Sequence, residues 1–450
     1  MMAQYLMSLD LGGSAAKGLL VDAATGQSFS SEKPWSNLKD AKYGVFALNL
    51  DLVAIWKALG DISKALISES GISASEIMGL AITSMRHTTI VLNGAEEILL
   101  ATPNLDARAL AEAANISEEH GEEIYSITGH WPSAIMAGAR LKWLAEKEPS
   151  LFAEAKTFFT LADWVGFKLT GQKTAEASLA AETLLLDLKK REWSEEVLRY
   201  LSLPKHLFPP IINAGQAIGT LISDAAKHLG LKEGLLVAAG GADTQAGLLG
   251  MGIYESDKLG IVAGSTTPVV LTSNQVFIDP QRRTWASLTL IPGQYICESN
   301  AGSMGSALEL FAKMLYADSH NPLFALNQDA AKLKPGETSV LSTAGAQLFN
   351  GSAVSIPLDS LTLSSMSLGS GLEGRMQVSR SILEGMAYGV LANLDQIKEV
   401  ASNRPDKAFI GGGMSRSAVC LKWLQICLIY PLLFPKTLMQ LLSARASVQG

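Results

Sequence analysis

The feature that most constrains this chain is a short unit that recurs along it. In each copy an apolar run is followed by a cluster of glycine, serine or threonine, and then by a second strand or a helix. Short apolar runs bounded by such residues predict β-strands, and the glycines predict tight turns at the strand ends. We therefore expect strands, glycine-rich turns and helices to alternate along the chain.

In the first half this pattern predicts a hairpin, a helix and two further strands. The hairpin joins Tyr5–Asp10 to Lys17–Asp22 through a Gly-Gly-Ser turn. Apolar residues at helical spacing predict an amphipathic helix over Ile55–Leu66. Gly79–Thr83 and Ile90–Leu92 are the further strands, and they flank a polar cluster.

The second half begins with a strand over Leu235–Ala239, a tight turn over 240–245 and a small-residue helix over Ala246–Gly252. A strand–turn–strand unit follows, with strands at Leu259–Ala263 and Val269–Leu271. Near the end, a short strand leads into three glycines at 411–413.

A chain of 450 residues is too long for one ordinary core, so we expect two domains. Nearly half of the residues are apolar and 18% are charged, which suits a compact protein without long disordered tracts. We place the domains at 1–240 and 241–450.

The formal net charge of −7, without any basic run, argues against nucleic acid as a partner. The sparse cysteines, Cys297, Cys420 and Cys427, lack metal-ligand spacing and predict reduced thiols in a reducing compartment. The apolar segment Leu424–Phe434 is interrupted by glutamine and proline and is far shorter than the roughly 20 residues of a membrane helix. With no cationic leader at the N-terminus, we expect a soluble cytoplasmic protein with no membrane partner.

The first hairpin predicts a phosphate site. Its glycines let backbone N–H groups approach an anion, because no side chain blocks the way. A carboxylate at the strand end suits a magnesium ion, and a lysine beyond the turn adds positive charge. The residues concerned are Asp10, Gly12, Gly13, Ser14 and Lys17. The alternative is an ordinary hairpin whose glycines only make the turn.

The second glycine cluster carries an acid, Asp243, between a strand and a helix. Phosphoryl transfer needs positioning, charge neutralisation and one group that deprotonates the attacking hydroxyl. Asp243 is the candidate general base and, with Asp10, a candidate metal ligand. The alternative is an aspartate that only caps the helix.

Three further clusters lie at 264–267, 302–306 and 411–413. A phosphate donor held by two domains requires such loops from both sides. Because the chain has 40 glycines, coincidental clusters are the alternative.

The order of these motifs resembles the FGGY family of carbohydrate kinases. The Asp10–Lys17 hairpin is similar to the family's first phosphate motif, and Gly240–Asp243 to the second, whose aspartate is the catalytic base. The phosphate loop of the family's second domain resembles Gly264, Ser265 and Thr266, and the adenosine motif resembles Gly411, Gly412 and Gly413.

The resemblance implies two actin-like (RNase H-like) α/β domains with the active site in the cleft between them. It implies ATP and Mg²⁺ as cofactors, with ATP mainly on the second domain and the sugar mainly on the first. A homodimer is common in the family.

Two segments lie where the family places its sugar contacts. Their donors and acceptors, Arg86, His87, Asn104, Asp106 and Arg108, suit adjacent hydroxyl groups. Within the family these segments most resemble autoinducer-2 kinases, and xylulokinases and gluconate kinases somewhat less. The alternative for Asp106 and Arg108 is a local ion pair on a loop.

Two features depart from the family pattern. Gly13 stands where a threonine is usual, and Ser14 is the candidate to supply that hydroxyl. After Ile426 the resemblance ends, and the chain stops at Gly450. A truncated gene or a shifted reading frame would produce this pattern, so we expect a second domain that is incomplete at its end.

The expected function is ATP-dependent phosphorylation of a hydroxyl on a small open-chain sugar, polyol or autoinducer-2-like dione. One alternative is a non-catalytic sugar- or signal-binding remnant of such a kinase. Another is a different actin-like class, either an ATP-hydrolysing assembly protein or an acetate-type kinase.

Overall fold

The computed structural model describes residues 4–353, 362–365, 371–401, 405, 407–416, 421–422, 424–425 and 432–433. The chain divides into two compact units. The first comprises Met1–Ala246 with residues 287–292 and 353–356, and the second comprises Gly247–Ala286, Gly293–Ser352 and Pro357–Gly450. The domain division at residue 240 stays a prediction. The expected end of the second domain and two of the three cysteines, Cys420 and Cys427, lie outside the described residues.

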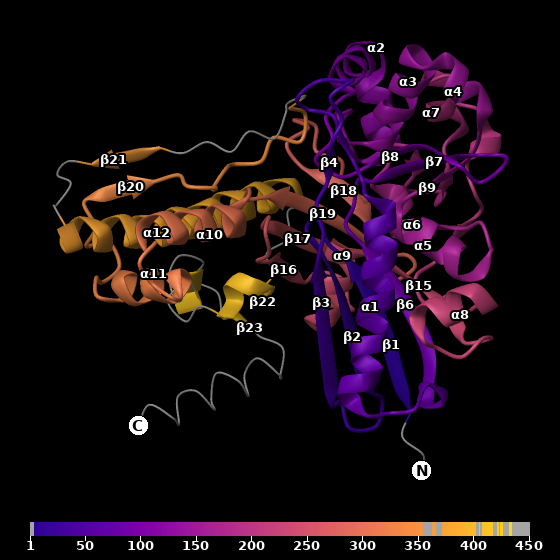
Figure 1. Ribbon diagram of the computed structural model, residues 1–450. Coiled ribbons are helices and arrows are strands. Elements are labelled where there is room, and N and C mark those ends of the chain that lie inside the picture. Colours follow the sequence, from indigo (N-terminus) through magenta and orange to yellow (C-terminus); the bar gives the residue numbers. More distant parts are fainter. Residues whose placement is uncertain are drawn as a thin grey trace. The chain divides into compact units, whose positions relative to one another are not determined.

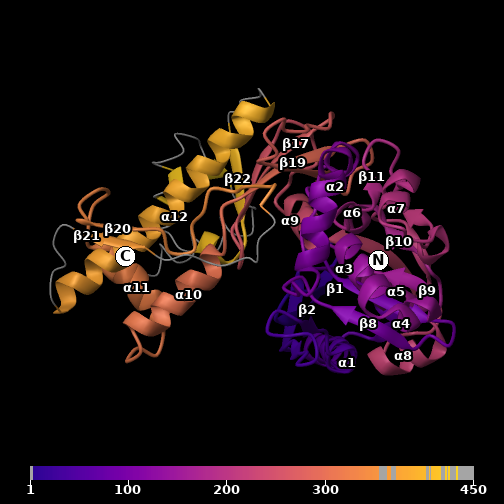
Figure 2. The same ribbon diagram turned by 90° about the horizontal axis from the view of Figure 1, so that it is seen from above.

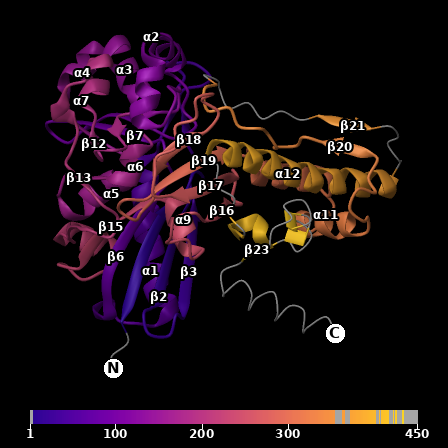
Figure 3. The same cartoon turned by 180° about the vertical axis from the view of Figure 1, so that it is seen from behind.

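The first unit is built on a six-stranded sheet in the order β14-β15-β6-β1-β2-β3, seen from opposite sides in Figures 1 and 3. The strand β2 is antiparallel to β1, and β3 is antiparallel to β2. On the other side, β6 runs parallel to β1, and β15 runs parallel to β6. The strands are β1 (Tyr5–Leu11), β2 (Ala15–Asp22), β3 (Ser28–Pro34), β6 (Ile77–Ser84), β14 (Ala217–Thr220) and β15 (Leu236–Ala242). The predicted hairpin and the strand at 79–83 are confirmed. Because β1, β6 and β15 are parallel, their carboxyl ends meet at one edge of the sheet.

The helix α1 (Leu52–Ser70) contains the predicted helix over Ile55–Leu66. Asp51 caps its start by accepting the N–H of Ala54 at 2.9 Å, and Gly71 ends it in the left-handed conformation. The four apolar residues at helical spacing, Ile55, Leu59, Ile62 and Leu66, are fully buried. The predicted amphipathic helix is thereby confirmed.

The helix α5 (Leu161–Thr170) packs on β6, β14 and β15, and its Trp164 meets Trp56 of α1 edge to face at 6.3 Å. A second, antiparallel sheet has the order β8-β7-β9 and contains the strand predicted at 90–92. Its strands are β7 (Thr89–Asn93), β8 (Ile98–Thr102) and β9 (Ala155–Phe159).

The other elements of the first unit are short strands and helices around these two sheets. The short strands are β4 (Leu38–Lys39), β5 (Leu48–Asn49), β10 (Ala175–Glu176), β11 (Leu186–Asp187), β12 (Glu192–Trp193) and β13 (Ile211–Ile212). The helices are α2 (Leu110–Thr128), α3 (Ala137–Lys147), α4 (Pro149–Glu154), α6 (Ala177–Ala181), α7 (Glu195–Tyr200) and α8 (Ser223–Leu229), with 3₁₀ turns η1 (Ala74–Glu76) and η2 (Lys205–Leu207).

The tight turn predicted over 240–245 is wrong. The strand β15 continues through both glycines, and the helix α9 (Asp243–Gly250) begins directly after it. A Cβ atom on Gly240 would lie 2.4 Å from the carbonyl oxygen of Ile82 in the neighbouring strand, and the β15–β6 register shifts between Ala239 and Gly241. These glycines therefore permit a close strand approach and a bulge rather than a turn.

The second unit is built on a six-stranded sheet, and five of its strands repeat the order and directions of five strands in the first unit. The strand order of its sheet is β18-β19-β17-β16-β22-β23. The strand β17 is antiparallel to β16, and β19 is antiparallel to β17. On the other side, β22 runs parallel to β16, and β23 runs parallel to β22. The strands are β16 (Leu259–Val262), β17 (Pro268–Ser273), β18 (Trp285–Leu288), β19 (Tyr295–Asn300), β22 (Ala408–Gly411) and β23 (Leu432–Leu433). The strand–turn–strand unit predicted at 259–271 is confirmed.

The helices of the second unit are α10 (Met304–Leu315), α11 (Pro322–Ala331) and the long α12 (Gly371–Ala401). Figure 2 shows α10 and α11 beside α12. A short hairpin of β20 (Val340–Ser342) and β21 (Leu363–Ser365) and a 3₁₀ turn, η3 (Gly413–Arg416), complete the unit. The core includes Cys297, whose thiol is buried, as the sequence predicts. None of the helices in the described part of the chain has the length and apolarity that crossing a bilayer requires.

Candidate active site

Three parallel strand ends in the first unit bring four predicted site residues together. Leu11 at the end of β1 lies opposite Ser84 of β6, and Ala242 of β15 lies opposite the same Ser84. Asp10 precedes the end of β1, Arg86 and His87 follow β6, and Asp243 follows β15. The sheet topology thus gathers residues that lie far apart in the sequence.

Asp10 is a carboxyl group in an unfavourable environment for its charge. Burial, followed by the negative charge of Asp243, raises its pKa to about 6, and Lys17, which lies opposite it in the β1–β2 register, acts in the other direction. Its Oδ1 atom is buried and has no hydrogen-bond partner among the described residues. Such an oxygen suits a cation or a proton that the protein itself does not supply.

Asp243 is the first residue of α9. Its Oδ1 accepts the N–H of Thr244 at 2.7 Å, whereas a capping carboxylate accepts from the second or third residue beyond it. Burial raises the pKa of Asp243, while the positive charge of Arg86 opposes the shift. A carboxylate with a raised pKa is a better proton acceptor, which suits a general base.

The position of Asp243 is held by the strand that precedes it. Thr83 donates its hydroxyl to the carbonyl oxygen of Gly241 at 2.7 Å, and Ala242 donates its N–H to Ser178 Oγ at 3.0 Å. Ser178 in turn donates to Glu176 Oε2 at 2.6 Å. The backbone on which the candidate base stands is therefore fixed from both sides.

The sequence analysis missed a buried carboxylate, Glu182, that joins these groups. Its Oε2 lies 3.4 Å from Arg86 Nη1 and 3.3 Å from His130 Nε2. Its Oε1 accepts Gln245 Nε2 at 3.0 Å and the Ser287 hydroxyl at 2.7 Å. Although burial raises the pKa of Glu182, the charge of Arg86 and the contact with His130 hold it well below its usual range.

His87 has a backbone conformation that a residue with a side chain rarely adopts, with φ at 58°. Its Nδ1 donates to the carbonyl oxygen of Glu182 at 3.0 Å. Burial lowers the pKa of His87 to about 3, so the ring is neutral at ordinary pH. The strained conformation is held by a bond from the buried Arg140, whose Nη1 donates to the His87 carbonyl oxygen at 2.6 Å.

The second predicted segment, residues 104–108, differs between its two ends in the hydrogen bonding of its polar side chains. Asn104 Oδ1 is buried without a hydrogen-bond partner among the described residues, so it remains available to a ligand. Asp106 and Arg108 instead pair with each other, with Arg108 Nε 2.7 and 2.9 Å from the two carboxylate oxygens. The geometry matches the alternative of a local ion pair, but the pair is buried rather than at the surface.

Arg108 also donates to other groups of the protein. Its Nη2 bonds Asn49 Oδ1 at 2.7 Å and the Leu48 carbonyl oxygen at 2.9 Å, and its Nη1 lies 3.3 Å from Asp40. It lines a pocket of about 330 Å³ with Tyr43 and Trp143. A contact of Asp106 or Arg108 with a substrate stays a prediction.

The tip of the first hairpin is open. Gly12 donates its N–H to the carbonyl oxygen of Ala15 at 3.0 Å, and nothing lies within 4 Å of a Cβ built on Gly13. Gly13, Ser14 and Lys17 are exposed. The backbone of the tip is therefore accessible to an anion.

In the second unit the two predicted nucleotide loops meet. Val262 of β16 lies opposite Gly411 of β22. The next residue, Gly412, has a left-handed backbone with φ at 98°. It lies so close to Ala263 that an added Cβ atom would be 2.5 Å from the Ala263 carbonyl oxygen. The loop that begins at Gly264 also touches the start of α10, because a Cβ on Gly305 would lie 2.0 Å from the Gly264 carbonyl oxygen.

Three backbone segments therefore converge in the second unit, namely 264–267, 302–306 and 411–414. Ser265 and Thr266 are exposed, and so are Gly412 and Gly413. Their arrangement leaves backbone N–H groups and small side chains at the surface, which suits phosphate groups.

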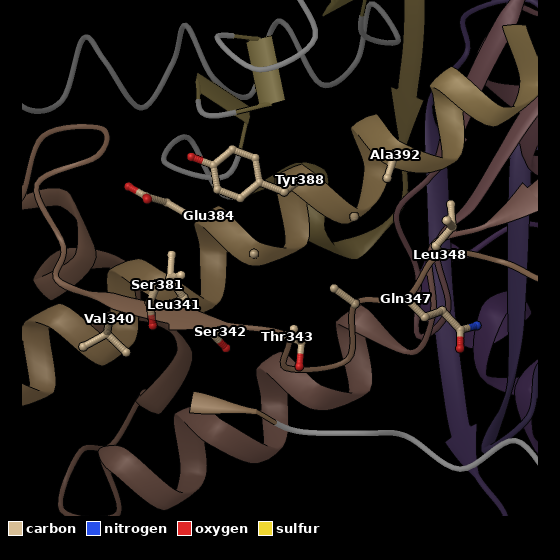
Figure 4. A pocket seen from close by; sticks show the side chains of 13 residues that line it. Val340, Leu341, Ser342, Thr343, Gln347, Leu348, Ser381, Glu384, Tyr388 and Ala392 are labelled. Carbon is tan, nitrogen blue, oxygen red and sulfur yellow. The ribbon is translucent and has the colours of Figure 1, made fainter. Parts of the chain in front are cut away.

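A separate pocket of the second unit, of about 340 Å³, lies between the segment 340–348 and α12. Figure 4 shows Val340, Ser342 and Thr343 on one side and Glu384 and Tyr388 on α12. None of the predicted nucleotide residues lines it, so we assign it no ligand.

The site residues fit a magnesium ion only together with a substrate. No group of three or more histidine, cysteine or carboxylate side chains in the described ranges could hold a metal ion alone. Asp10 offers a buried, unpartnered oxygen near Asp243. Magnesium commonly takes one or two carboxylates and completes its shell with phosphates and water, so this donor set fits it.

The chain was also compared with known proteins. The N-terminal domain of the FGGY family of carbohydrate kinases matches residues 5–250. The chain is 29% identical over 369 residues to a putative sugar kinase, YoaC, of Bacillus subtilis, covering 81% of this chain and 73% of that protein. It is 26% identical over 438 residues to the autoinducer-2 kinase of Escherichia coli, covering 94% of this chain and 80% of that one.

Among solved structures, a xyloylose kinase from Brucella ovis superposes with a TM-score of 0.83 at 22% identity. The match covers 96% of this chain and 87% of that protein. At this identity the likeness shows the fold alone. It confirms an α/β fold with two actin-like domains.

Proposed function

Because the chain belongs to the FGGY family of carbohydrate kinases, enzymes that phosphorylate a hydroxyl group with ATP as donor, we propose that its acceptor is a small open-chain sugar, polyol or autoinducer-2-like dione. The observation that carries the proposal is the convergence of Asp10, Arg86, His87 and Asp243 at the ends of three parallel strands. Ligands of α/β sheets bind at such strand ends.

In this proposal Asp243 is the general base. Its carboxylate takes the proton of the acceptor hydroxyl while the oxygen of that hydroxyl attacks the γ-phosphorus of ATP. The raised pKa supports this role, because the carboxylate binds a proton more readily than an exposed aspartate does. Thr83 and Ser178 hold the backbone of the strand before it, so the base has a defined position.

The acceptor is held by Arg86, His87 and Asn104. Arg86 carries N–H donors for the hydroxyl groups of the acceptor. The buried Oδ1 of Asn104, which has no hydrogen-bond partner among the described residues, accepts a hydrogen bond from one of these hydroxyl groups. In this proposal Asp106 and Arg108 stabilise the conformation of the segment that carries Asn104, because their charged groups pair with each other.

The nucleotide is held by the second unit, with its phosphates on Gly264, Ser265 and Thr266 and its adenosine on the loop at 411–413. The convergence of these backbone segments supports the assignment. Asp10 would hold Mg²⁺, and Asp243 would lie beside it; the ion would neutralise charge on the transferred phosphoryl group. The tip of the first hairpin would approach the phosphates with its backbone N–H groups and Lys17.

The test is the variant Asp243→Asn in a coupled ATP assay with a panel of pentuloses, polyols, gluconate and the autoinducer dione. We expect loss of turnover by at least about a hundredfold, because a positioned base contributes roughly 100- to 10,000-fold. Acceptor binding, followed by the shift in thermal midpoint, should persist. Normal turnover by the variant would refute the assignment of the base.

The same panel separates the kinase from the alternative of a binding protein. Stabilisation of the unaltered chain by an acceptor, without any response to Mg²⁺–ATP and without turnover, would favour the binding protein. Stabilisation by both ligands together with turnover supports the kinase.

A further inference from the structure

The two segments proposed to bind the acceptor are joined by one buried side chain. Arg140 lies on α3 and its side chain is fully buried. Its Nη1 donates to the carbonyl oxygen of His87 at 2.6 Å, and its Nη2 donates to the carbonyl oxygens of Pro103 at 2.7 Å and Asp106 at 2.6 Å. One guanidinium therefore bonds the backbone of both segments.

These three carbonyl groups stand beside the residues that would touch the acceptor. His87 is itself one of them and follows Arg86, while Pro103 and Asp106 enclose Asn104. The planar fork of a guanidinium has fixed geometry, so the three bonds fix the separation and the orientation of the two segments. The charge is balanced by Asp106, whose Oδ2 lies 3.7 Å from Arg140 Nε.

The conformation of His87 indicates that this separation is imposed rather than adopted freely. A φ of 58° is unfavourable for a residue with a side chain, and such a conformation persists where the surroundings hold it. Among the bonds that hold it are the one from Arg140 to its carbonyl oxygen and the one from its own ring to the Glu182 carbonyl oxygen.

We propose that Arg140 is a positioning residue for the acceptor: it sets the distance between the Arg86–His87 pair and Asn104, and thereby the size of the acceptor that both can bind at once. Arg140 does not touch the acceptor, because its guanidinium is bonded to three carbonyl groups and no part of it is exposed. The inference rests on the proposed function, since it assigns the acceptor to these two segments.

The test compares the Michaelis constants of the acceptor and of ATP in the variants Arg140→Lys and Arg140→Met. Lysine keeps the charge but replaces the fork by a point charge, so it cannot hold all three carbonyl groups in the same geometry. We expect the acceptor KM to rise about tenfold in Arg140→Lys and more in Arg140→Met, because small displacements at an active site cost up to roughly 100-fold. The ATP KM should stay within about twofold of the unaltered value.

A second readout is the preference between acceptors of different length. We expect the ratio of kcat/KM between the best acceptor and one that is a carbon shorter or longer to fall in Arg140→Lys. A merely structural role would lower the active fraction and the thermal midpoint, and would leave the acceptor KM and this ratio unchanged; that result overturns the proposal.

The matched control is Lys142→Met, a cation two residues further along the same helix. Lys142 pairs with Glu146 at 2.9 Å on the same helix. The control should leave both Michaelis constants unchanged. Arg86→Ala in the same assay separates a failure of the proposed acceptor site from a failure of the role of Arg140. If Arg86→Ala leaves the acceptor KM unchanged, the proposed acceptor site is wrong. If Arg86→Ala raises the acceptor KM and Arg140→Lys does not, only the role of Arg140 is wrong.

If neither Arg140 variant folds, hydrogen exchange of the unaltered protein decides. The proposal expects the amides of residues 84–88 and 104–108 to gain protection together when the acceptor binds. Protection of one segment without the other overturns it.

Discussion

Asp10 and Asp243 are two carboxyl groups of like charge at the ends of β1 and β15, the two strands that flank β6. Burial raises the pKa of both, and their mutual repulsion adds to the shift of Asp10. Without a ligand the site therefore holds unfavourable negative charge. Such stored repulsion is typical of sites that bind a cation or accept a proton during the reaction.

The raised pKa of Asp10 gives a prediction about stability and pH. A carboxyl whose pKa is about 6 in the folded chain and near 3.8 when unfolded binds its proton first in the folded state. Its destabilising effect is fully present above pH 6 and vanishes as the pH falls below about 4. Asp10→Asn should thus stabilise the ligand-free protein at pH 7.5 by roughly 2 kcal/mol.

Urea unfolding of the ligand-free protein and of Asp10→Asn at several pH values measures this. The difference in the free energy of unfolding should shrink as the pH is lowered from 7.5 toward 4.5. A difference that does not change with pH would contradict a raised pKa at Asp10. The same variant should lose activity, because the proposed magnesium ligand is removed.

Glu182 gives a second prediction at a single residue. It is the buried counter-charge of Arg86 and also accepts from Gln245 and Ser287. Removing one partner of a buried ion pair costs about 3–5 kcal/mol, so Glu182→Gln should lower the free energy of unfolding by an amount of that order and raise the acceptor KM.

The control is Glu196→Gln, which removes an exposed carboxylate 4.0 Å from Arg199. Exposed pairs contribute about 0–1 kcal/mol, so this variant should resemble the unaltered protein in urea unfolding and in KM. Equal effects of the two substitutions would show that Glu182 is not the organising charge of the site.

Among the secondary-structure elements, β16 and β22 of the second unit approach each other closely at their ends. Gly412 follows β22 in a left-handed conformation directly beside Ala263. Gly413, one residue further, has nothing within 4 Å of an added Cβ. Alanine substitutions at these two glycines therefore compare a position where a side chain is excluded with an adjacent position where there is room for one.

Gly412→Ala should destabilise the second unit by about 2 kcal/mol or more, because it adds a clash to an unfavourable φ. Gly413→Ala should change the stability by less than about 1 kcal/mol. Thermal unfolding of both variants measures the difference. Equal stability of the two would contradict the tight approach of the β16 and β22 ends.

The chain as a whole has two units, each with its own core, and five strands of the two sheets share the same order. The candidate acceptor residues lie in the first unit and the candidate nucleotide loops in the second. Ligands should therefore protect different parts of the chain.

Hydrogen exchange with each ligand alone tests this division. Mg²⁺–ATP should protect residues 264–267, 302–306 and 411–414, and an acceptor should protect 84–88 and 104–108. A ligand at 100 times its dissociation constant adds about 2.7 kcal/mol of stability, which is enough to slow exchange measurably. Protection of 84–88 by ATP alone, with no effect at 264–267, would reverse the proposed assignment of the units.

Local pattern in the sequence was sufficient for the first hairpin, the first helix and several further strands, and it supplied the candidate residues. The hairpin at 5–22 and the helix over Ile55–Leu66 follow from apolar spacing and glycine, which act within a few residues. Asp10, Arg86 and Asp243 were identified because each stands in a polar or glycine cluster at a predicted strand end. The family of the chain was likewise identified from the order of such motifs, and it is confirmed.

The tertiary structure decided what no local pattern contains. The glycines at 240 and 241 were expected to turn the chain, but a neighbouring strand approaches so closely that they continue β15. Arg140 lies in α3 and Glu182 directly follows α6, with no motif around either, and only packing brings them against His87. A buried charge acquires its role from partners far away in the sequence, because its desolvation must be balanced by whichever groups the fold places beside it.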